Sequence, residues 1–193
     1  MDTKQLLSFL NKLEKLKNIT RHSWTSEGRR ESVAEHSWRL ASMVCLLKDE
    51  LKGYDIHKMI TMALFHDLGE IKYGDVPGFD KTDTDVEREK AALEEVAEEY
   101  KELGIESIIE NVRDFDRKGS KEARVVNALD KIEAVIQHNE ADLKTWIERE
   151  YEMNLTYGTD ECGFENVLAD LRAKVRIQTE DKVGTRGEKN ETN

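Results

Sequence analysis

Four residues of the metal-ligand type lie within or at the end of apolar segments, where an unpaired polar group is costly. His66 and Asp67 close the most apolar stretch of the chain, Met59–Phe65. His36 lies near the start of one predicted helix, and Asp130 lies among the apolar residues of another. An ionised carboxylate in such surroundings costs several kcal/mol unless a positive partner compensates its charge. Because imidazole and carboxylate groups together suit a borderline divalent cation, the sequence indicates a candidate metal site.

Each of these residues also has an explanation that needs no metal. A single histidine at a helix start is most often a surface or core residue. The His66–Asp67 doublet could be a polar pair that ends a helix. Asp130 precedes Lys131, so these two could form an ordinary ion pair. Spacing alone does not bring the four side chains together in space.

The elements that would position these residues are helices. Leucines at 6, 10, 13 and 16 recur at helical spacing and predict a first amphipathic helix over residues 3–17. Ser32 and Glu35 form a capping-box pattern, which predicts the start of the helix that carries His36. Asp55 is a predicted N-cap for the apolar helix that ends at His66. Residues 18–31 break the periodicity and predict a loop.

The second half of the chain predicts further helices. Thr84 and Glu87 form another capping-box pattern, so we expect a long charged helix that Gly104 terminates. Residues 105–115 and 120–139 predict two more, and the latter carries Asp130. We therefore predict an all-α helical bundle with residues 1–179 as one domain. Residues 180–193 have almost nothing to bury and are predicted to be a disordered tail.

The composition disfavours several classes of partner. The formal net charge is −11, and proteins that bind nucleic-acid polymers usually present a basic face, so no such partner is expected. No apolar run is long enough to cross a membrane, and the amphipathic N-terminus lacks a signal-peptide cleavage site, so we expect a cytoplasmic protein. An acidic protein can still bind a small phosphate where a cation and a few arginines reverse the local field.

The segments around the candidate ligands resemble the HD-domain phosphohydrolases. His36, the His66–Asp67 doublet and Asp130 follow the H…HD…D order of that family's signature. The 5′-deoxynucleotidase branch, whose members include the bacterial YfbR proteins and the eukaryotic HD-domain-containing protein 2, is similar over longer stretches. These stretches are ESVAEHS at 31–37, FHDLGEIKYGDVP at 65–77, LDK at 129–131 and RHSW at 21–24. The resemblance runs in order from about residue 6 to residue 130 and more loosely to about residue 177.

This resemblance implies an HD-type helical bundle with one divalent metal ion. The ion would be Mn²⁺, Co²⁺, Zn²⁺, Fe²⁺ or Mg²⁺, and its implied ligands are His36, His66, Asp67 and Asp130. By analogy with the matching glutamate of the family, Glu70 is the predicted general acid or base. Asp75 is the second predicted catalytic residue, acting by proton transfer or by contact with the sugar. Members of the branch are often homodimers, which implies the same for this chain.

Positive and aromatic side chains supply candidate contacts to the substrate. A guanidinium can bind a phosphate through two hydrogen bonds, and a tryptophan offers a flat face to a sugar or base. Lys131 could offset the ligand carboxylates or approach the phosphate. The predicted substrate-binding residues are Arg21, Trp24, Arg29, Arg30 and Lys131.

The activity that the resemblance implies is removal of the 5′-phosphate from nucleoside monophosphates, with deoxynucleotides as the expected substrates. The alternatives are a cyclic-nucleotide phosphodiesterase, a nucleoside triphosphohydrolase, and a metal-stabilised nucleotide sensor without turnover. Glu70 distinguishes an enzyme from a sensor, because a sensor needs no acid–base residue beside its metal.

Overall fold

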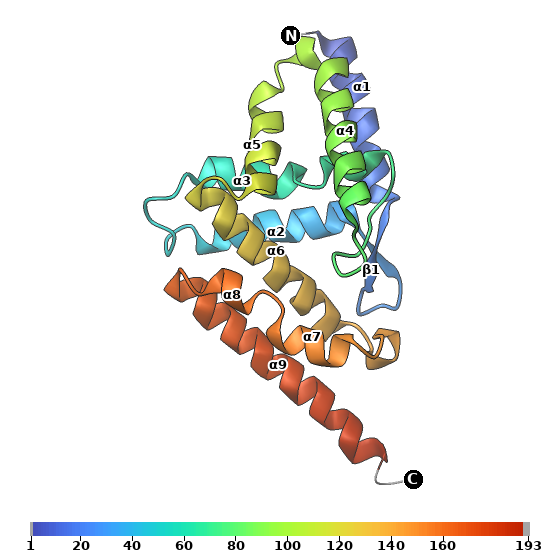
Figure 1. The fold of residues 1–193 in the computed structure, drawn as a ribbon, viewed down its shortest axis with the longest axis vertical. Coiled ribbons are helices and arrows are strands. Elements are labelled where there is room, and N and C mark those ends of the chain that lie inside the picture. The colour runs from blue at the N-terminus through green and yellow to red at the C-terminus, as the bar shows by residue number, and fades with distance from the viewer. Residues whose placement is uncertain (1, 191–193) are drawn as a thin grey trace. The chain divides into compact units, whose positions relative to one another are not determined.

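The computed structural model describes residues 2–190, and helices dominate them (Figure 1). The predicted all-α class is confirmed, with one small two-stranded sheet added to it. The chain divides into two compact units. The first comprises the residues up to His22 together with Glu31–Val126, and the second comprises Ser23–Arg30 and the residues from Asn127 onward.

The elements follow one another as mostly short helices. The symbol η denotes a 3₁₀ helix. In chain order they are α1 (Thr3–Leu13), η1 (Glu14–Lys17), β1 (Thr20–Trp24), β2 (Arg30–Ser32), α2 (Val33–Leu47), α3 (Ile56–Phe65), η2 (Leu68–Ile71), α4 (Asp83–Glu99), η3 (Lys101–Leu103), α5 (Glu106–Arg117), α6 (Lys121–Glu140), η4 (Leu143–Thr145), α7 (Glu150–Thr156), α8 (Thr159–Cys162) and α9 (Asn166–Asn190).

The helix starts that position the site are set by local sequence. Ser32 caps α2 in the predicted capping box with Glu35, and the Asp55 carboxylate accepts a hydrogen bond from the backbone of Lys58 at the start of α3. The predicted box at Thr84 was wrong, because Thr82 caps α4 and pairs with Asp85 instead. Two overlapping patterns of the same type compete there, and the earlier one forms the cap.

The predicted loop at 18–31 was also wrong, because it contains the paired strands β1 and β2. The Thr25 backbone N–H donates to the Arg29 carbonyl over 2.7 Å, and Gly28, at φ 78°, supplies the left-handed turn residue between the strands. Strand prediction relies on alternating apolar residues, and β1 offers only one buried side chain, Ser23.

The first unit has a core that links α1, α4 and α5 to the segments around the site. Figure 1 shows α1 and α4 side by side, and Phe9 packs against Tyr100 with ring centroids 5.0 Å apart. Leu68 and Ile71 of η2 belong to the same core, so their packing fixes the position of this short helix. The members of this cluster are Phe9, Leu16, Val33, Leu68, Ile71, Leu93, Val96, Tyr100, Ile105, Ile109 and Val112.

The second unit is held by buried polar contacts to α9. Arg172 is buried and donates to the carbonyls of Tyr157 and Asn154, over 2.7 and 2.9 Å. Asn139 of α6 donates to the Val175 carbonyl and accepts a hydrogen bond from Thr179. The predicted domain boundary near residue 179 stays a prediction. Helix α9 continues past it to Asn190, and residues 191–193 of the predicted tail lie outside the described part.

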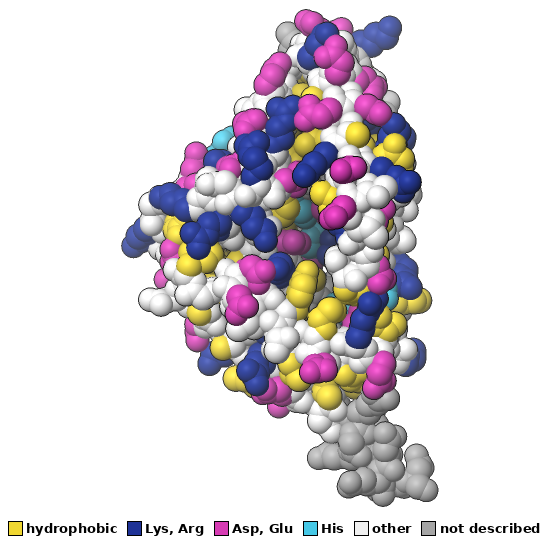
Figure 2. Space-filling view, in the orientation of Figure 1, with side chains coloured by type: hydrophobic (Ala, Val, Ile, Leu, Met, Phe, Trp, Pro, Cys, Tyr) yellow, Lys and Arg dark blue, Asp and Glu magenta, His cyan; other side chains and the backbone are white. Residues whose placement is uncertain are grey.

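The surface carries charges of both signs. Figure 2 shows acidic and basic side chains interspersed over one face of the molecule. Within residues 2–190, no helix is both long and apolar enough to cross a lipid bilayer.

Candidate metal centre

His36 is fully buried in the first turn of α2, where the capping box fixes the backbone. The Ser32 hydroxyl accepts the Glu35 backbone N–H over 3.2 Å, and the Glu35 carboxylate accepts the Ser32 backbone N–H over 2.9 Å. Two otherwise unpaired N–H groups are thereby satisfied, so the first turn does not fray. A fixed first turn sets the direction in which the His36 ring projects.

His66 and Asp67 lie where α3 ends, as the sequence predicts. His66 is the C-cap residue, and its ring Nδ1 lies 3.1 Å from the carbonyl oxygen of Ala63. A carbonyl oxygen can only accept, so Nδ1 carries the proton in this hydrogen bond. In a neutral ring Nε2 then presents its lone pair, which is the usual arrangement of a metal-binding histidine.

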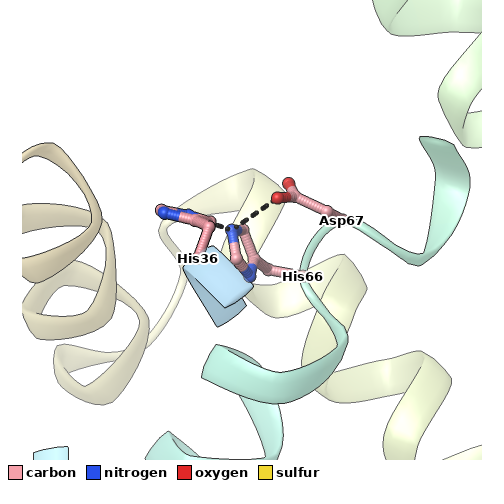
Figure 3. A group of neighbouring side chains, drawn as sticks. All are labelled: His36, His66 and Asp67. Carbon is pink, nitrogen blue, oxygen red and sulfur yellow. Dashed lines mark hydrogen bonds and ion pairs between the residues drawn. The ribbon is translucent and has the colours of Figure 1, made fainter. Parts of the chain in front are cut away.

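The side chains of His36, His66 and Asp67 converge on one point (Figure 3). His66 Nε2 lies 3.3 Å from His36 Nε2 and 3.1 Å from Asp67 Oδ2. One ligand atom from each residue lies within 4.8 Å of the other two. Asp67 Oδ2 is buried and accepts no hydrogen bond from the described residues. Two imidazole nitrogens and a carboxylate oxygen at this spacing form a donor set that fits a divalent cation.

The electrostatic environment keeps Asp67 ionised. Burial raises the pKa of the Asp67 carboxyl, but His66, His36 and Arg21 more than offset this effect, so the pKa lies well below its usual range. Arg21 Nη1 is 3.6 Å from Asp67 Oδ2. A predicted substrate-binding residue therefore lies beside a predicted metal ligand, within the first unit.

Glu70, on η2, differs from Asp67 in that its carboxyl group is protonated. It is only 3% exposed, and its Oε2 atom has no hydrogen-bond partner among the described residues. Burial, reinforced by Asp67 and Asp75, raises the pKa of the Glu70 carboxyl to about 10. The same field acts on half-buried Asp75, where burial is the main cause of a raised pKa. Glu70 thus holds a proton at neutral pH beside a carboxylate that does not.

Several charged residues of this region were missed by the sequence analysis. Glu31 is buried, with its carboxylate 3.4 Å from Arg21 Nε and 4.0 Å from Arg39 Nη2. Lys81 and Glu89 form an ion pair near Glu70. Glu31 stands in the ESVAEHS stretch, which was the only available signal, because charged residues carry no periodic pattern that reveals a distant partner.

The remaining predicted site residues belong to the second unit. Trp24 has the Arg30 guanidinium 4.5 Å from its ring centroid, and Arg29 Nη1 donates to the Arg30 carbonyl. Lys131 forms an ion pair with Glu161. Asp130 is half-buried on α6. Their roles toward the metal or the substrate stay predictions.

The fold and this donor set define a helical protein built to bind a metal. A model of the HD-domain family matches residues 13–171, and the chain belongs to this family. The family predicted from the signature residues is thereby confirmed.

Two relatives of this chain are named for the same enzyme activity. The chain is 37% identical over 142 residues to the 5′-deoxynucleotidase HDDC2 of Dictyostelium discoideum, covering 68% of this chain and 74% of that protein. It is 29% identical over 141 residues to 5′-deoxynucleotidase HDDC2 of Homo sapiens, covering 71% and 68%. A predicted metal-dependent phosphohydrolase from Magnetospirillum magnetotacticum has a TM-score of 0.77 at 24% identity, covering 96% of this chain and 94% of that one, which shows a shared fold.

Proposed function

We propose that this protein is a metal-dependent phosphohydrolase that removes the 5′-phosphate from nucleoside monophosphates, with deoxynucleotides preferred. The convergence of the His36, His66 and Asp67 ligand atoms, with one buried Asp67 oxygen that accepts no hydrogen bond from the described residues, carries this proposal. The relatives named 5′-deoxynucleotidase support the substrate class.

The proposed cofactor is one divalent metal ion: Mn²⁺, Co²⁺, Zn²⁺, Fe²⁺ or Mg²⁺. His36, His66 and Asp67 would hold it, and Asp130 is the proposed fourth ligand, in keeping with its place in the H…HD…D signature. When bound, the ion supplies the Lewis acidity that polarises the phosphoryl group and acidifies the attacking water. Asp130→Asn should therefore weaken metal binding.

Glu70 is the proposed proton carrier. Hydrolysis joins a water oxygen to phosphorus and breaks the bond from phosphorus to the 5′-oxygen, which must then gain a proton. The raised pKa of the Glu70 carboxyl suits it to donate that proton. Arg21 would bind a non-bridging phosphate oxygen, since its guanidinium lies beside Asp67. Asp75 would assist by sharing a proton or by contacting the sugar.

The test is phosphate release from deoxy- and ribonucleoside mono-, di- and triphosphates and from cyclic nucleotides. Metal-stripped protein would be assayed alone and with each candidate cation. We expect metal-dependent hydrolysis of the monophosphates, faster for the deoxy forms. Release only from triphosphates or cyclic nucleotides would move the assignment to those activities. Bound nucleotide without turnover would indicate a sensor.

Other features predicted from the sequence remain part of the proposal. These are the substrate contacts of Trp24, Arg29, Arg30 and Lys131, a homodimeric state and a cytoplasmic location. Light scattering after size-exclusion chromatography would test the oligomeric state. Single substitutions of the four residues would show whether each changes KM for a monophosphate.

A further inference from the structure

Two lysines stand at opposite ends of the segment that joins η2 to α4, residues 72–82. Each forms an ion pair with a glutamate of α4. Lys72 Nζ lies 2.6 Å from a carboxylate oxygen of Glu95, and Lys81 Nζ lies 2.8 Å from one of Glu89. The two pairs have the same chemistry, but their surroundings differ, because the Lys72 side chain is 44% exposed and that of Lys81 is 27% exposed.

The Lys81–Glu89 pair lies close to η2, the short helix that carries Glu70. A Cβ atom on Gly69 would come within 2.6 Å of the Glu89 carbonyl oxygen, so α4 touches the chain immediately before Glu70. The Lys81 backbone N–H donates to the Pro77 carbonyl over 3.0 Å, which closes a turn that begins two residues after Asp75. Lys81 is therefore paired with the residue of α4 whose backbone packs against η2, next to Glu70.

The two lysines also differ in the charged groups that surround them. Burial lowers the pKa of Lys81, but its hydrogen bond and ion pair with Glu89, together with the nearby acidic side chains of Glu70 and Asp67, outweigh burial and leave the pKa raised. Lys81 in turn acts to lower the pKa of Glu70 and Asp75. The raised pKa of Lys72 comes instead from its hydrogen bonds to Glu95 and Tyr73, outside the site.

A monophosphate dianion would enter a region of four carboxyl groups, Asp67, Glu70, Asp75 and Glu89, and needs cationic partners to do so. Arg21 is one such partner in the proposed function, but Glu31 and Asp67 share its charge, so a second cation is needed. We propose that Lys81 binds the phosphate group of the substrate and that Glu89 holds its ammonium group until the phosphate replaces the carboxylate. This inference rests on the proposed function, because it assumes that a phosphate occupies the same site. A lysine suits it, since a flexible stem can carry a point charge from one anion to another.

The test uses inorganic phosphate as the probe, with its affinity for metal-loaded protein measured by isothermal titration calorimetry. Lys81→Met should weaken phosphate binding by about tenfold or more, because a charge-assisted hydrogen bond is lost. Lys81→Arg should restore most of it. Lys72→Met is the matched control, as it breaks the other lysine–glutamate pair of the same segment, and it should leave phosphate affinity unchanged.

Glu89→Gln distinguishes a Lys81 that binds phosphate from a Lys81 that only anchors residues 72–82 to α4. If Glu89 competes with phosphate for Lys81, this substitution should strengthen phosphate binding. If the pair only anchors residues 72–82, Lys81→Met and Glu89→Gln should both weaken it, and that result would overturn the inference. Equal affinity in wild type and Lys81→Met would overturn it too. Lys81-dependent phosphate binding without hydrolysis of any nucleotide would instead contradict the proposed function, and of this inference it would leave only the binding of phosphate by Lys81.

Discussion

Replacing Glu70 by glutamine should change how the stability of the metal-free protein depends on pH. Glu70 is 3% exposed, and the pKa of its carboxyl is raised from 4.5 to about 10, mainly by burial. The folded protein therefore holds this proton more tightly than the unfolded chain does. A group of this kind contributes stability that is fully present below pH 4.5 and is lost as the pH rises toward its folded pKa.

The size of the effect follows from the pH window. Between the two pKa values, the unfolded chain has lost the Glu70 proton while the folded protein keeps it. Each unit of rising pH then removes about 1.4 kcal/mol from the free energy of unfolding. Raising the pH from about 6 to about 8 should cost wild type about 2.7 kcal/mol through this residue alone. Glutamine has no proton to lose and should contribute no such slope.

Urea unfolding in the presence of a chelator measures this quantity. Wild type and Glu70→Gln would be compared at each pH, so that the contributions of all other titrating groups cancel in the difference. We expect the wild-type advantage to shrink as the pH rises. A difference that stays constant over this range would refute the reasoning, because it would mean that Glu70 is already ionised in the folded protein.

Three further outcomes follow from the same geometry. A divalent cation at a hundred times its dissociation constant should stabilise the protein by about 2.7 kcal/mol in thermal unfolding, and Asp67→Asn should lose most of this gain. Glu70→Gln should lower kcat by about a hundredfold or more in a phosphate-release assay, whereas its metal content by elemental analysis should match wild type. Retained turnover would remove Glu70 from the mechanism. Gly69→Ala should destabilise the protein by about 1–3 kcal/mol in urea unfolding, since its Cβ would lie 2.6 Å from the Glu89 carbonyl oxygen. An unchanged unfolding midpoint would show that α4 does not pack closely against η2 at Gly69.

The features that the sequence predicted correctly are those set by local signals. The capping box at Ser32 and the cap at Asp55 depend on residues three positions apart, and both form as expected. The His66–Asp67 doublet ends an apolar helix as expected, because the apolar run defines where that helix stops. The resemblance then singled out His36 as their companion, which spacing could not do.

The features that were missed depend on contacts between distant residues. Arg21 and Glu31 come together because β1 pairs with β2, and neither strand has an alternating apolar pattern. Nothing in the sequence distinguishes Lys81 from a surface lysine, because its ion pair with Glu89 depends on how α4 packs. The raised pKa of Glu70 is likewise a consequence of tertiary burial, so its residue type and position could suggest an acid–base role but not its protonation state.

The proposed nucleotide phosphohydrolase activity depends on one divalent cation at the His36–His66–Asp67 centre. Its most direct test is phosphate release from a deoxynucleoside monophosphate by metal-stripped protein as Mn²⁺ or Co²⁺ is titrated in. We expect no phosphate release without metal and a rise that saturates near one equivalent. Full activity in the stripped protein, or no release at any metal concentration despite bound metal, would contradict it.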